Sequence, residues 1–351
     1  MTIPKSTVGL DEIAKKTKVA VSTVSRALRN LPGIHPETRT RILRVAQTLG
    51  YSARGGKTDG AQPNPRHILI LTIGEETPSG YTAGLSRASV QLNIALHFHH
   101  ASRSNCDDFL TPENLPPSLR EEMILGIILV YGWPEKIVEK ISRRFPTVSI
   151  VHTYPQADVD VLGIDHTGGM FALVKHLKTA GHQKIGFLGL DPEVSWARSR
   201  FAGYLEALLT MNLPLSKDYL VELNLSALHE ETGRMAEGIM AGLKKGVRAW
   251  ICADDFIGYD LCAELLRRGV RIPDDVAITG FHRHPHIRHG NLPLLTSTKV
   301  DSELMGFNAL HQLDYRMNHP KQSSQLILMP ATLAQGQTTL SPKSSEVCFT
   351  P

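Results

Sequence analysis

A short stretch near the amino terminus carries side chains that are suited to contacting nucleic acid. The outward side of a helix expected here comprises Val21, Ser22, Ser25, Arg26 and Arg29. Short hydroxyls and guanidinium groups are the side chains that reach DNA phosphates and the base edges in a major groove. The chemistry that this stretch predicts is therefore the recognition of double-stranded DNA.

The apolar spacing around this stretch predicts three short helices. Apolar residues recur at helical spacing over 10–30 and are interrupted near Lys18, which indicates two helices joined by a tight turn. A third helix is expected from Pro36, which is tolerated at a first helical position, to about Gly50. Three helices of this size form a helix-turn-helix domain, which we place at 1–52.

The distribution of charge also separates this amino-terminal head from the rest of the chain. The first 60 residues carry a formal charge of +7, whereas the remaining 291 sum to −3, within a total of +4. A basic head on a mildly acidic body is expected of a nucleic-acid contact module joined to another domain, although a solvated basic face is the alternative. A length of 351 residues with 42% apolar and 21% charged residues indicates two to three globular units.

The head resembles a known family of bacterial regulators. The run LDEIAKKTKVAVSTVSRALRN, followed by HPETRTRILRVAQTLGY, is similar to the DNA-binding domain of the lactose-repressor (LacI/GalR) family. The resemblance implies that Val21 and Ser22 read bases and that Arg26 contacts a base. It also implies that Thr23 and Ser25 contact phosphates, although local helix capping would explain these two hydroxyls as well.

The head departs from the family pattern at its helix ends and in the linker. Ala20 and His35 stand where the family often has a hydroxyl N-cap, whose loss typically costs about 1 kcal/mol. Arg29 replaces the usual asparagine and adds a charge for a phosphate. In the linker, placed at 53–65, Gly60 occupies the position of the family's minor-groove leucine. Because glycine disfavours helix, we expect a flexible linker without an intercalating wedge.

Beyond the linker, apolar runs alternate with amphipathic stretches. Candidate strands lie at 67–73, 94–98, 124–130, 147–151, 184–189, 247–252 and 276–280. Candidate helices lie near 81–92, 134–144, 168–180, 197–211, 231–244 and 257–269. This alternation predicts an α/β body in which parallel sheets are covered on both faces.

The body resembles the effector domain of the same family, which is similar to periplasmic sugar-binding proteins. The matching motifs are HLKTAGHQKIGFLG from His176, RFAGY from Arg200 and IPDDVAITGF from Ile272. The resemblance implies two α/β lobes, three crossovers and a ligand in the cleft between the lobes. We place the effector-binding domain at 66–340, with one lobe at 66–163 and 299–323, the other at 164–297 and 325–340, and a tail at 341–351.

The resemblance also implies which residues contact the effector. Arg200 aligns with an arginine that holds ligand hydroxyls or a carboxylate, with a salt bridge between lobes or at the surface as the alternative. Asp254 falls at the family's acidic or asparagine pair after a strand. Trp196 is placed to stack on a sugar ring or to join the core, and Tyr81 is a candidate from the opposing lobe.

A cluster of histidines and arginines follows the last of these motifs. His282 stands where the family usually has an aspartate, and Arg283, His284, His286, Arg288 and His289 follow it. An imidazole flanked by arginines favours an effector with a carboxylate or phosphate over a neutral sugar. The spacing of these histidines, and of His97, His99 and His100, would suit a metal strand, but no carboxylate or cysteine set accompanies either group. We therefore expect no metal. The alternative to a ligand-binding role for this cluster is a solvated basic loop.

The sequence contains no pattern that indicates catalysis or a cofactor. Neither a glycine-rich nucleotide loop nor a G-x-S-x-G or H-E-x-x-H motif occurs. The four cysteines form no C-x-x-C pair, and no signal peptide or apolar run of about 20 residues is evident. We expect a cytoplasmic protein that is neither an enzyme nor a membrane protein.

These patterns together predict a ligand-responsive transcription regulator. We expect a repressor that binds operator DNA as a homodimer, because paired heads read two half-sites, and that responds to a sugar or an anionic sugar derivative. No leucine heptad for tetramer formation follows the effector domain. A solute-binding protein is the alternative, but it leaves the V-S-T-V-S-R motif unexplained. An enzyme built on the two-lobe fold lacks a nucleophile or base that we can name.

Overall fold

The computed structural model forms two compact units, residues 1–63 and 64–351, and each is described by itself. The structure describes residues 9–28, 34–49, 51, 64–74, 77–102, 104, 106–121, 123–283 and 290–339. The side chain of Arg29, most of the linker, the positions from His284 to His289 and the tail lie outside the described residues. The expectations for these segments stay predictions.

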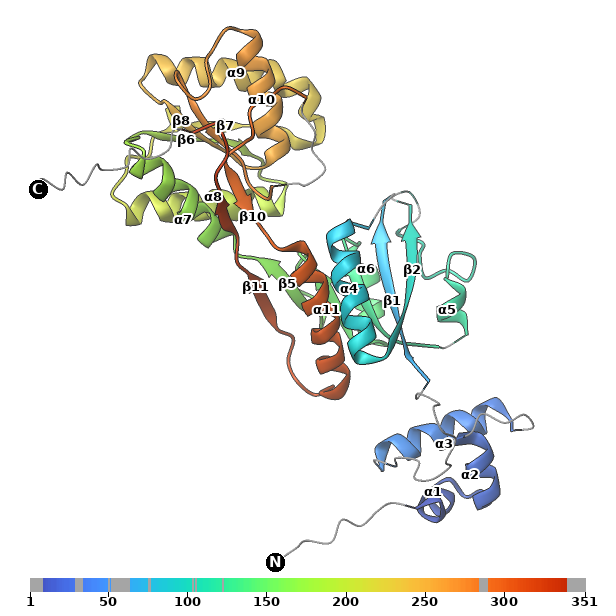
Figure 1. Ribbon diagram of the computed structural model, residues 1–351. Coiled ribbons are helices and arrows are strands. Elements are labelled where there is room, and N and C mark those ends of the chain that lie inside the picture. Colours follow the sequence, from blue (N-terminus) through green and yellow to red (C-terminus); the bar gives the residue numbers. More distant parts are fainter. Residues whose placement is uncertain are drawn as a thin grey trace, which may run out of the picture. The chain divides into compact units, whose positions relative to one another are not determined.

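The first unit contains the three helices that the sequence predicts. They are α1 (Leu10–Thr17), α2 (Val21–Leu28) and α3 (Pro36–Thr48), seen in Figure 1. α1 ends at Thr17, and the C-cap Lys18 adopts a left-handed conformation with φ of 54° and turns the chain into α2. The helices meet around a small apolar core that includes Ile13, Val24, Ala27 and Ile42. This core fixes which side of α2 faces outward.

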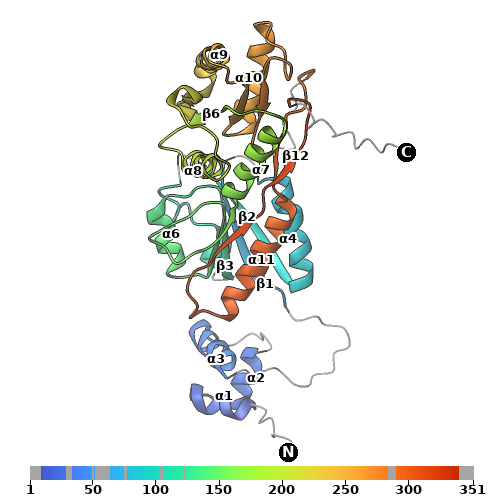
Figure 2. The same ribbon diagram turned by 90° about the vertical axis from the view of Figure 1, so that its left-hand side faces the viewer.

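One lobe of the second unit is built on a six-stranded parallel sheet. Its strands run in the order β11-β5-β4-β3-β1-β2. They are β1 (Arg66–Ile73), β2 (Ile94–Ala101), β3 (Ile124–Val130), β4 (Thr147–Ile150), β5 (Asp160–Ile164) and β11 (Leu326–Met329). Figure 2 shows α4 (Ser79–Leu92) and α11 (Ser302–Asn318) on one side of this sheet, and α6 (Glu135–Ser142) on the other. The short α5 (Pro117–Arg120) precedes β3. Because both faces are covered, the inner strands β1 and β3 are nearly continuous apolar runs.

The other lobe is built on a four-stranded parallel sheet in the order β7-β6-β8-β9. Its strands are β6 (Ile185–Leu190), β7 (Leu220–Glu222), β8 (Ala249–Cys252) and β9 (Ala277–Thr279). Its helices are α7 (His166–Thr179), α8 (Ser195–Thr210), α9 (Leu228–Lys244) and α10 (Asp255–Arg267), with short 3-10 turns at Lys217–Tyr219 and Leu225–Ala227. A two-stranded antiparallel ribbon joins β10 (Ser297–Lys299) to β12 (Thr332–Ala334).

The chain passes between the lobes three times, after β5, after β10 and after β11. The sequence placed 325–340 in the second lobe, but β11 is an edge strand of the first lobe's sheet. The structural reason is its pairing with β5, in which Leu326 lies opposite Val161. The backbone N–H of Gln325 also donates to the Asp160 carboxylate at 2.8 Å. The third crossover therefore begins only at about Pro330.

Candidate functional site

The outward side of α2 presents the side chains that the sequence predicted for DNA contact. Val21, Ser22 and Arg26 are exposed, and Val21 keeps 39% of its surface accessible although it is apolar. Thr23 and Ser25 are half-buried at the edge of this face. Since Val24 and Ala27 fill the opposite side of the helix, the residues predicted to read bases are not needed for the core of the head.

The residue before α2 carries no hydroxyl for an N-cap, as the sequence indicated. Ala20 precedes the helix, and its carbonyl accepts hydrogen bonds from the backbone N–H groups of Thr23 and Val24 at 2.9 and 3.1 Å. α1 likewise begins at Gly9 without a side-chain cap. Packing in the apolar core therefore holds α1 and α2 together.

The second unit contains a cavity of about 920 Å³ that both lobes line. All five residues predicted to contact an effector lie around it: Tyr81, Trp196, Arg200, Asp254 and His282. Pockets of a few hundred to about 1,000 Å³ are typical of small-molecule sites. Tyr81 comes from the first lobe, near the start of α4, and the other four come from the second lobe.

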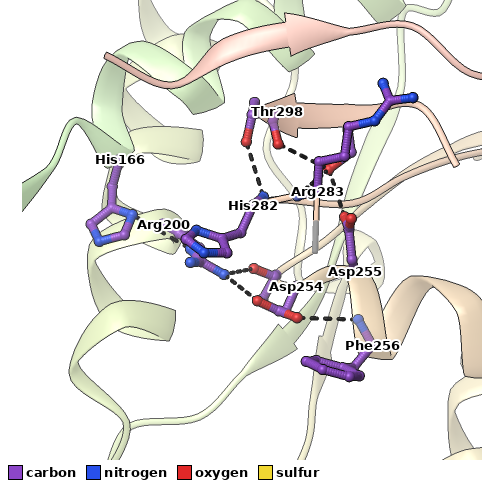
Figure 3. Close-up of polar contacts among 10 residues, drawn as sticks. His166, Arg200, Asp254, Asp255, Phe256, His282, Arg283 and Thr298 are labelled. Atoms are coloured by element: carbon purple, nitrogen blue, oxygen red, sulfur yellow. Dashed lines mark hydrogen bonds and ion pairs between the residues drawn. The ribbon is translucent and has the colours of Figure 1, made fainter. Parts of the chain in front are cut away.

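Arg200 is buried at the wall of the cavity, with only 4% of its surface exposed. Its Nη1 donates to the Asp254 carboxylate at 2.9 Å and to the Ala253 carbonyl at 2.5 Å, and its Nε lies 3.4 Å from Nδ1 of His166 (Figure 3). Among the described residues, Nη2 has no hydrogen-bond partner. Arg200 therefore forms a salt bridge, but this bridge is buried within the second lobe, so it is neither the bridge between lobes nor the surface bridge considered as the alternative.

Two aromatic rings hold the guanidinium plane. The guanidinium carbon of Arg200 lies 4.6 Å from the centre of the Trp196 ring and 4.2 Å from that of Phe281. Stacking of this kind fixes the orientation of the guanidinium group, since the quadrupoles of both rings attract the charge. Trp196 consequently both lines the cavity and positions Arg200.

The charges near Arg200 balance locally. Burial lowers the pKa of Arg200, and the ion pair with Asp254 opposes that shift. Burial, with Arg200 and His282 nearby, lowers the pKa of His166 to about 3, so this imidazole is neutral at neutral pH. Asp254 also serves as the N-cap of α10, because its other carboxylate oxygen accepts from the N–H of Phe256 at 3.1 Å.

His282 lies on the loop after β9 and extends toward Arg200 (Figure 3). Its backbone has φ of 91°, and that of Arg283 has φ of 34°. Tyr81 is almost completely buried, and burial raises the pKa of its hydroxyl to about 12, so that the hydroxyl remains a hydrogen-bond donor. The cavity therefore offers aromatic faces, neutral donors, one arginine and the carboxylates of Asp254 and Asp260.

Comparison with known proteins assigns both units. The head matches the bacterial regulatory proteins of the lacI family over residues 9–53, and residues 174–339 match the periplasmic binding protein-like domain. The chain thus joins a lacI-family DNA-binding domain to a periplasmic binding protein-like domain. The fold class and the absence of an enzymatic role that the sequence predicted agree with this assignment, because the matched relatives are transcriptional regulators.

Relatives of the LacI family match the chain at nearly full length. The transcriptional regulator DegA of Bacillus subtilis (strain 168) is 22% identical over 336 residues, covering 93% of this chain and 97% of DegA. The lactose operon repressor of Klebsiella pneumoniae is 24% identical over 336 residues, covering 91% of this chain and 89% of that repressor.

Solved structures of the LacI family share the fold. The regulator CelR in complex with cellobiose has a TM-score of 0.64 and 22% identity, covering 94% of this chain and 99% of CelR. The lac repressor dimer bound to operator and the anti-inducer ONPF has a TM-score of 0.63 and 20% identity. This match covers 96% of the present chain and 100% of the repressor chain. None of the described helices combines the length and apolarity needed to cross a bilayer.

Several residues that line the cavity were missed in the sequence. Tyr131 and His152 follow β3 and β4, and Phe256 and Asp260 lie one turn apart on α10. Burial lowers the pKa of His152. Ligands in open α/β folds bind at the carboxyl ends of strands, so the positions just after predicted strands were a usable signal for Tyr131 and His152. No comparable signal marks Asp260.

The described histidines do not assemble into a metal site. Over the described parts of the chain, no group of three or more histidine, cysteine, aspartate or glutamate side chains is placed to hold a metal ion. Nδ1 of His67 instead lies 2.7 Å from Nε2 of His97, and the His99 ring packs against Phe109 with centroids 5.6 Å apart. His284 and His286 lie outside the described residues.

Proposed function

We propose that this chain is a cytoplasmic repressor that binds operator DNA as a homodimer and responds to a small molecule in the cavity. The observation that supports this proposal is that one chain combines an exposed face of α2, which bears Val21, Ser22 and Arg26, with a cavity lined by Arg200 and the four other predicted effector residues. Two copies of the head would read two half-sites, because a single recognition helix contacts only a few base pairs.

The DNA-binding half of the proposal is tested by selecting sites from random duplexes and titrating the selected site in gel shifts at several salt concentrations. We expect a site that resists competitor DNA and an affinity that falls steeply with salt, because phosphate contacts release counterions. A solute-binding protein, the alternative function, would show neither property. Selection that enriches no sequence would contradict the proposal.

Arg26→Ala tests the base-reading assignment. If Arg26 contacts a base, its loss should weaken specific binding by about 1–3 kcal/mol and relax the preference at one position of the site. Arg143→Ala is the matched control, since it removes the same charge from an exposed position in the other unit. An unchanged ratio of specific to random binding in Arg26→Ala would remove this residue from the reading face.

For the effector, we propose a sugar or an anionic sugar derivative. Aromatic side chains such as Trp196 offer faces for a sugar ring, and Nη2 of Arg200 offers donors to a hydroxyl or carboxylate. The charged residues in the described lining are Arg200, Asp254 and Asp260. Arg200 is already paired with Asp254, and Asp260 makes no ion pair with a described residue, so an anionic group also needs the basic residues that follow His282.

Calorimetry with cellobiose, glucose, gluconate and glucose 6-phosphate separates these effector classes. Stronger binding of the acid or phosphate forms would support the anionic class, and stronger binding of the neutral sugars would exclude it. Asp260→Asn should favour the acidic forms by a few-fold, because it removes a like charge from the cavity wall. Asp107→Asn is the control at an exposed position outside the lining.

A further inference from the structure

Two consecutive residues at the cavity have a backbone conformation that side chains disfavour. His282 and Arg283 both have positive φ, at 91° and 34°. Such values are uncommon outside glycine, and each is unfavourable unless the surroundings compensate for it. Contacts around these two residues must therefore offset the strain.

The compensating contacts come from the crossover strand β10. The backbone N–H of His282 donates to Oγ1 of Thr298 at 3.2 Å, and that of Arg283 donates to Oγ of Ser297 at 3.3 Å (Figure 3). Both hydroxyl residues are completely buried. Two successive side chains of one strand thus bind two successive N–H groups of the strained turn.

The same strand is tied to the start of α10. Oγ of Ser297 donates to the Asp255 carboxylate at 2.6 Å, and the N–H of Asp255 donates to the Phe281 carbonyl at 3.2 Å. Asp255 directly follows Asp254, the ion-pair partner of Arg200. Hydrogen bonds and adjacent residues therefore lead without a break from the cavity wall to β10.

Beyond β10, the chain enters the other lobe. Asp301 caps α11 by accepting the N–H of Leu304 at 2.9 Å, and the next residue, Ser302, again lines the cavity. A displacement of β10 would therefore move residues on both sides of the cavity. The hydroxyls of Ser297 and Thr298 connect the turn at His282 to this crossover, because they accept the two backbone N–H groups of the turn.

We propose that Ser297 and Thr298 are positioning residues that hold His282 in its strained conformation and so couple the cavity wall to the crossover strand. This inference rests on the proposed role of the cavity as the effector site. A ligand that moves His282 must change its bond to Thr298, and the position of β10 with it. Loss of either hydroxyl frees the turn, and the imidazole of His282 leaves its place beside Arg200.

Histidine NMR on the full-length protein tests this positioning without any ligand. With ¹³C-labelled histidine, the signal of His282 is identified by its disappearance in His282→Gln. We expect Thr298→Val to shift this signal, whereas Thr298→Ser, which restores the hydroxyl, returns it to the wild-type position. Thr332→Val is the matched control, because the Thr332 hydroxyl donates to Lys299 on the same crossover strand and not to His282.

A double-mutant cycle measures the coupling. Glycine accepts positive φ, so His282→Gly removes the strain that Thr298 compensates. Thr298→Val should lower the urea midpoint of unfolding in the wild type and lower it clearly less in the His282→Gly background. A His282 signal that stays in place in Thr298→Val, or that moves equally in Thr332→Val, overturns the proposal, as does an additive cycle. Because neither measurement uses DNA or a sugar, failure here is distinguishable from failure of the proposed function.

Discussion

At the scale of single residues, Arg200 both forms a buried ion pair with Asp254 and lines the cavity. A buried guanidinium without a counterion would be strongly unfavourable, so the arginine needs Asp254 even when no ligand is present. Trp196 and Phe281 then fix the plane of the guanidinium group. The pair thus keeps a charged group ordered at the wall of an apolar cavity.

Asp254→Asn tests this balance by removing the charge while keeping a cap oxygen for α10. The variant leaves Arg200 buried without its counterion, so we expect the free energy of unfolding in urea to fall by about 3–5 kcal/mol. Glu139→Gln is the control, because its partner Arg143 is largely exposed and such surface pairs contribute about 0–1 kcal/mol. Equal effects of the two variants would show that the buried pair contributes no more to the free energy of unfolding than the exposed pair does.

At the scale of elements, α2 is placed by tertiary packing rather than by its own ends. Val24 and Ala27 pack into the core of the head, while Ala20 supplies no hydroxyl for the exposed N–H groups of the first turn. Tertiary packing usually contributes more to such short helices than intrinsic propensity does. The side chains predicted to contact DNA therefore lie on a helix whose first turn could be stabilised by an N-cap hydroxyl.

Ala20→Ser should stabilise the start of α2. Serine at an N-cap is worth about 0.5–2 kcal/mol relative to alanine, because its oxygen accepts an otherwise unpaired N–H group. We expect slower amide hydrogen exchange in the first turn of α2 in the full chain. Ala20→Val, which enlarges the side chain without adding an oxygen, should not slow this exchange. Equal protection in the two variants would contradict the capping explanation.

The sequence predicted most regular elements of the body, but it missed those that depend on distant partners. The candidate strand at 124–130 coincides with β3, because its apolar run reflects burial on both faces. By contrast, β5 was not identified, and β11 was assigned to the wrong lobe. β11 keeps Leu326 and Leu328 exposed and is defined by its pairing with β5, which no local pattern reveals.

At the scale of the whole molecule, buried neutral histidines link stability to pH. The pKa of His166 is about 3 in the folded protein against 6.5 as its ordinary value. The unfolded chain therefore takes up this proton below about pH 6.5, whereas the folded chain does not until about pH 3. Stability from this group is complete above pH 6.5 and decreases as the pH falls toward 3. Burial lowers the pKa of His152 and His176 in the same direction.

His166→Gln should reduce this pH dependence. In the wild type we expect His166 to contribute a slope of up to about 1.4 kcal/mol per pH unit below pH 6, measured as the urea midpoint at several pH values. Glutamine cannot take up the proton, so the variant should lose less stability between pH 7 and pH 5. His319→Gln is the control at an exposed position. A slope unchanged in His166→Gln would exclude this histidine as its source.

Local patterns in the sequence by themselves determined the head, its charge and the family. The face of α2 that is predicted to contact DNA depends on residues within one short helix, so periodicity and motif were sufficient to predict it. The five residues predicted to contact an effector could be named only through the resemblance. The sequence showed neither the pairing of Arg200 with Asp254, 54 positions away, nor that of His282 with Thr298. Only the tertiary structure decided these contacts, because separate strands bring them together at their carboxyl ends, where strand order and register set every distance.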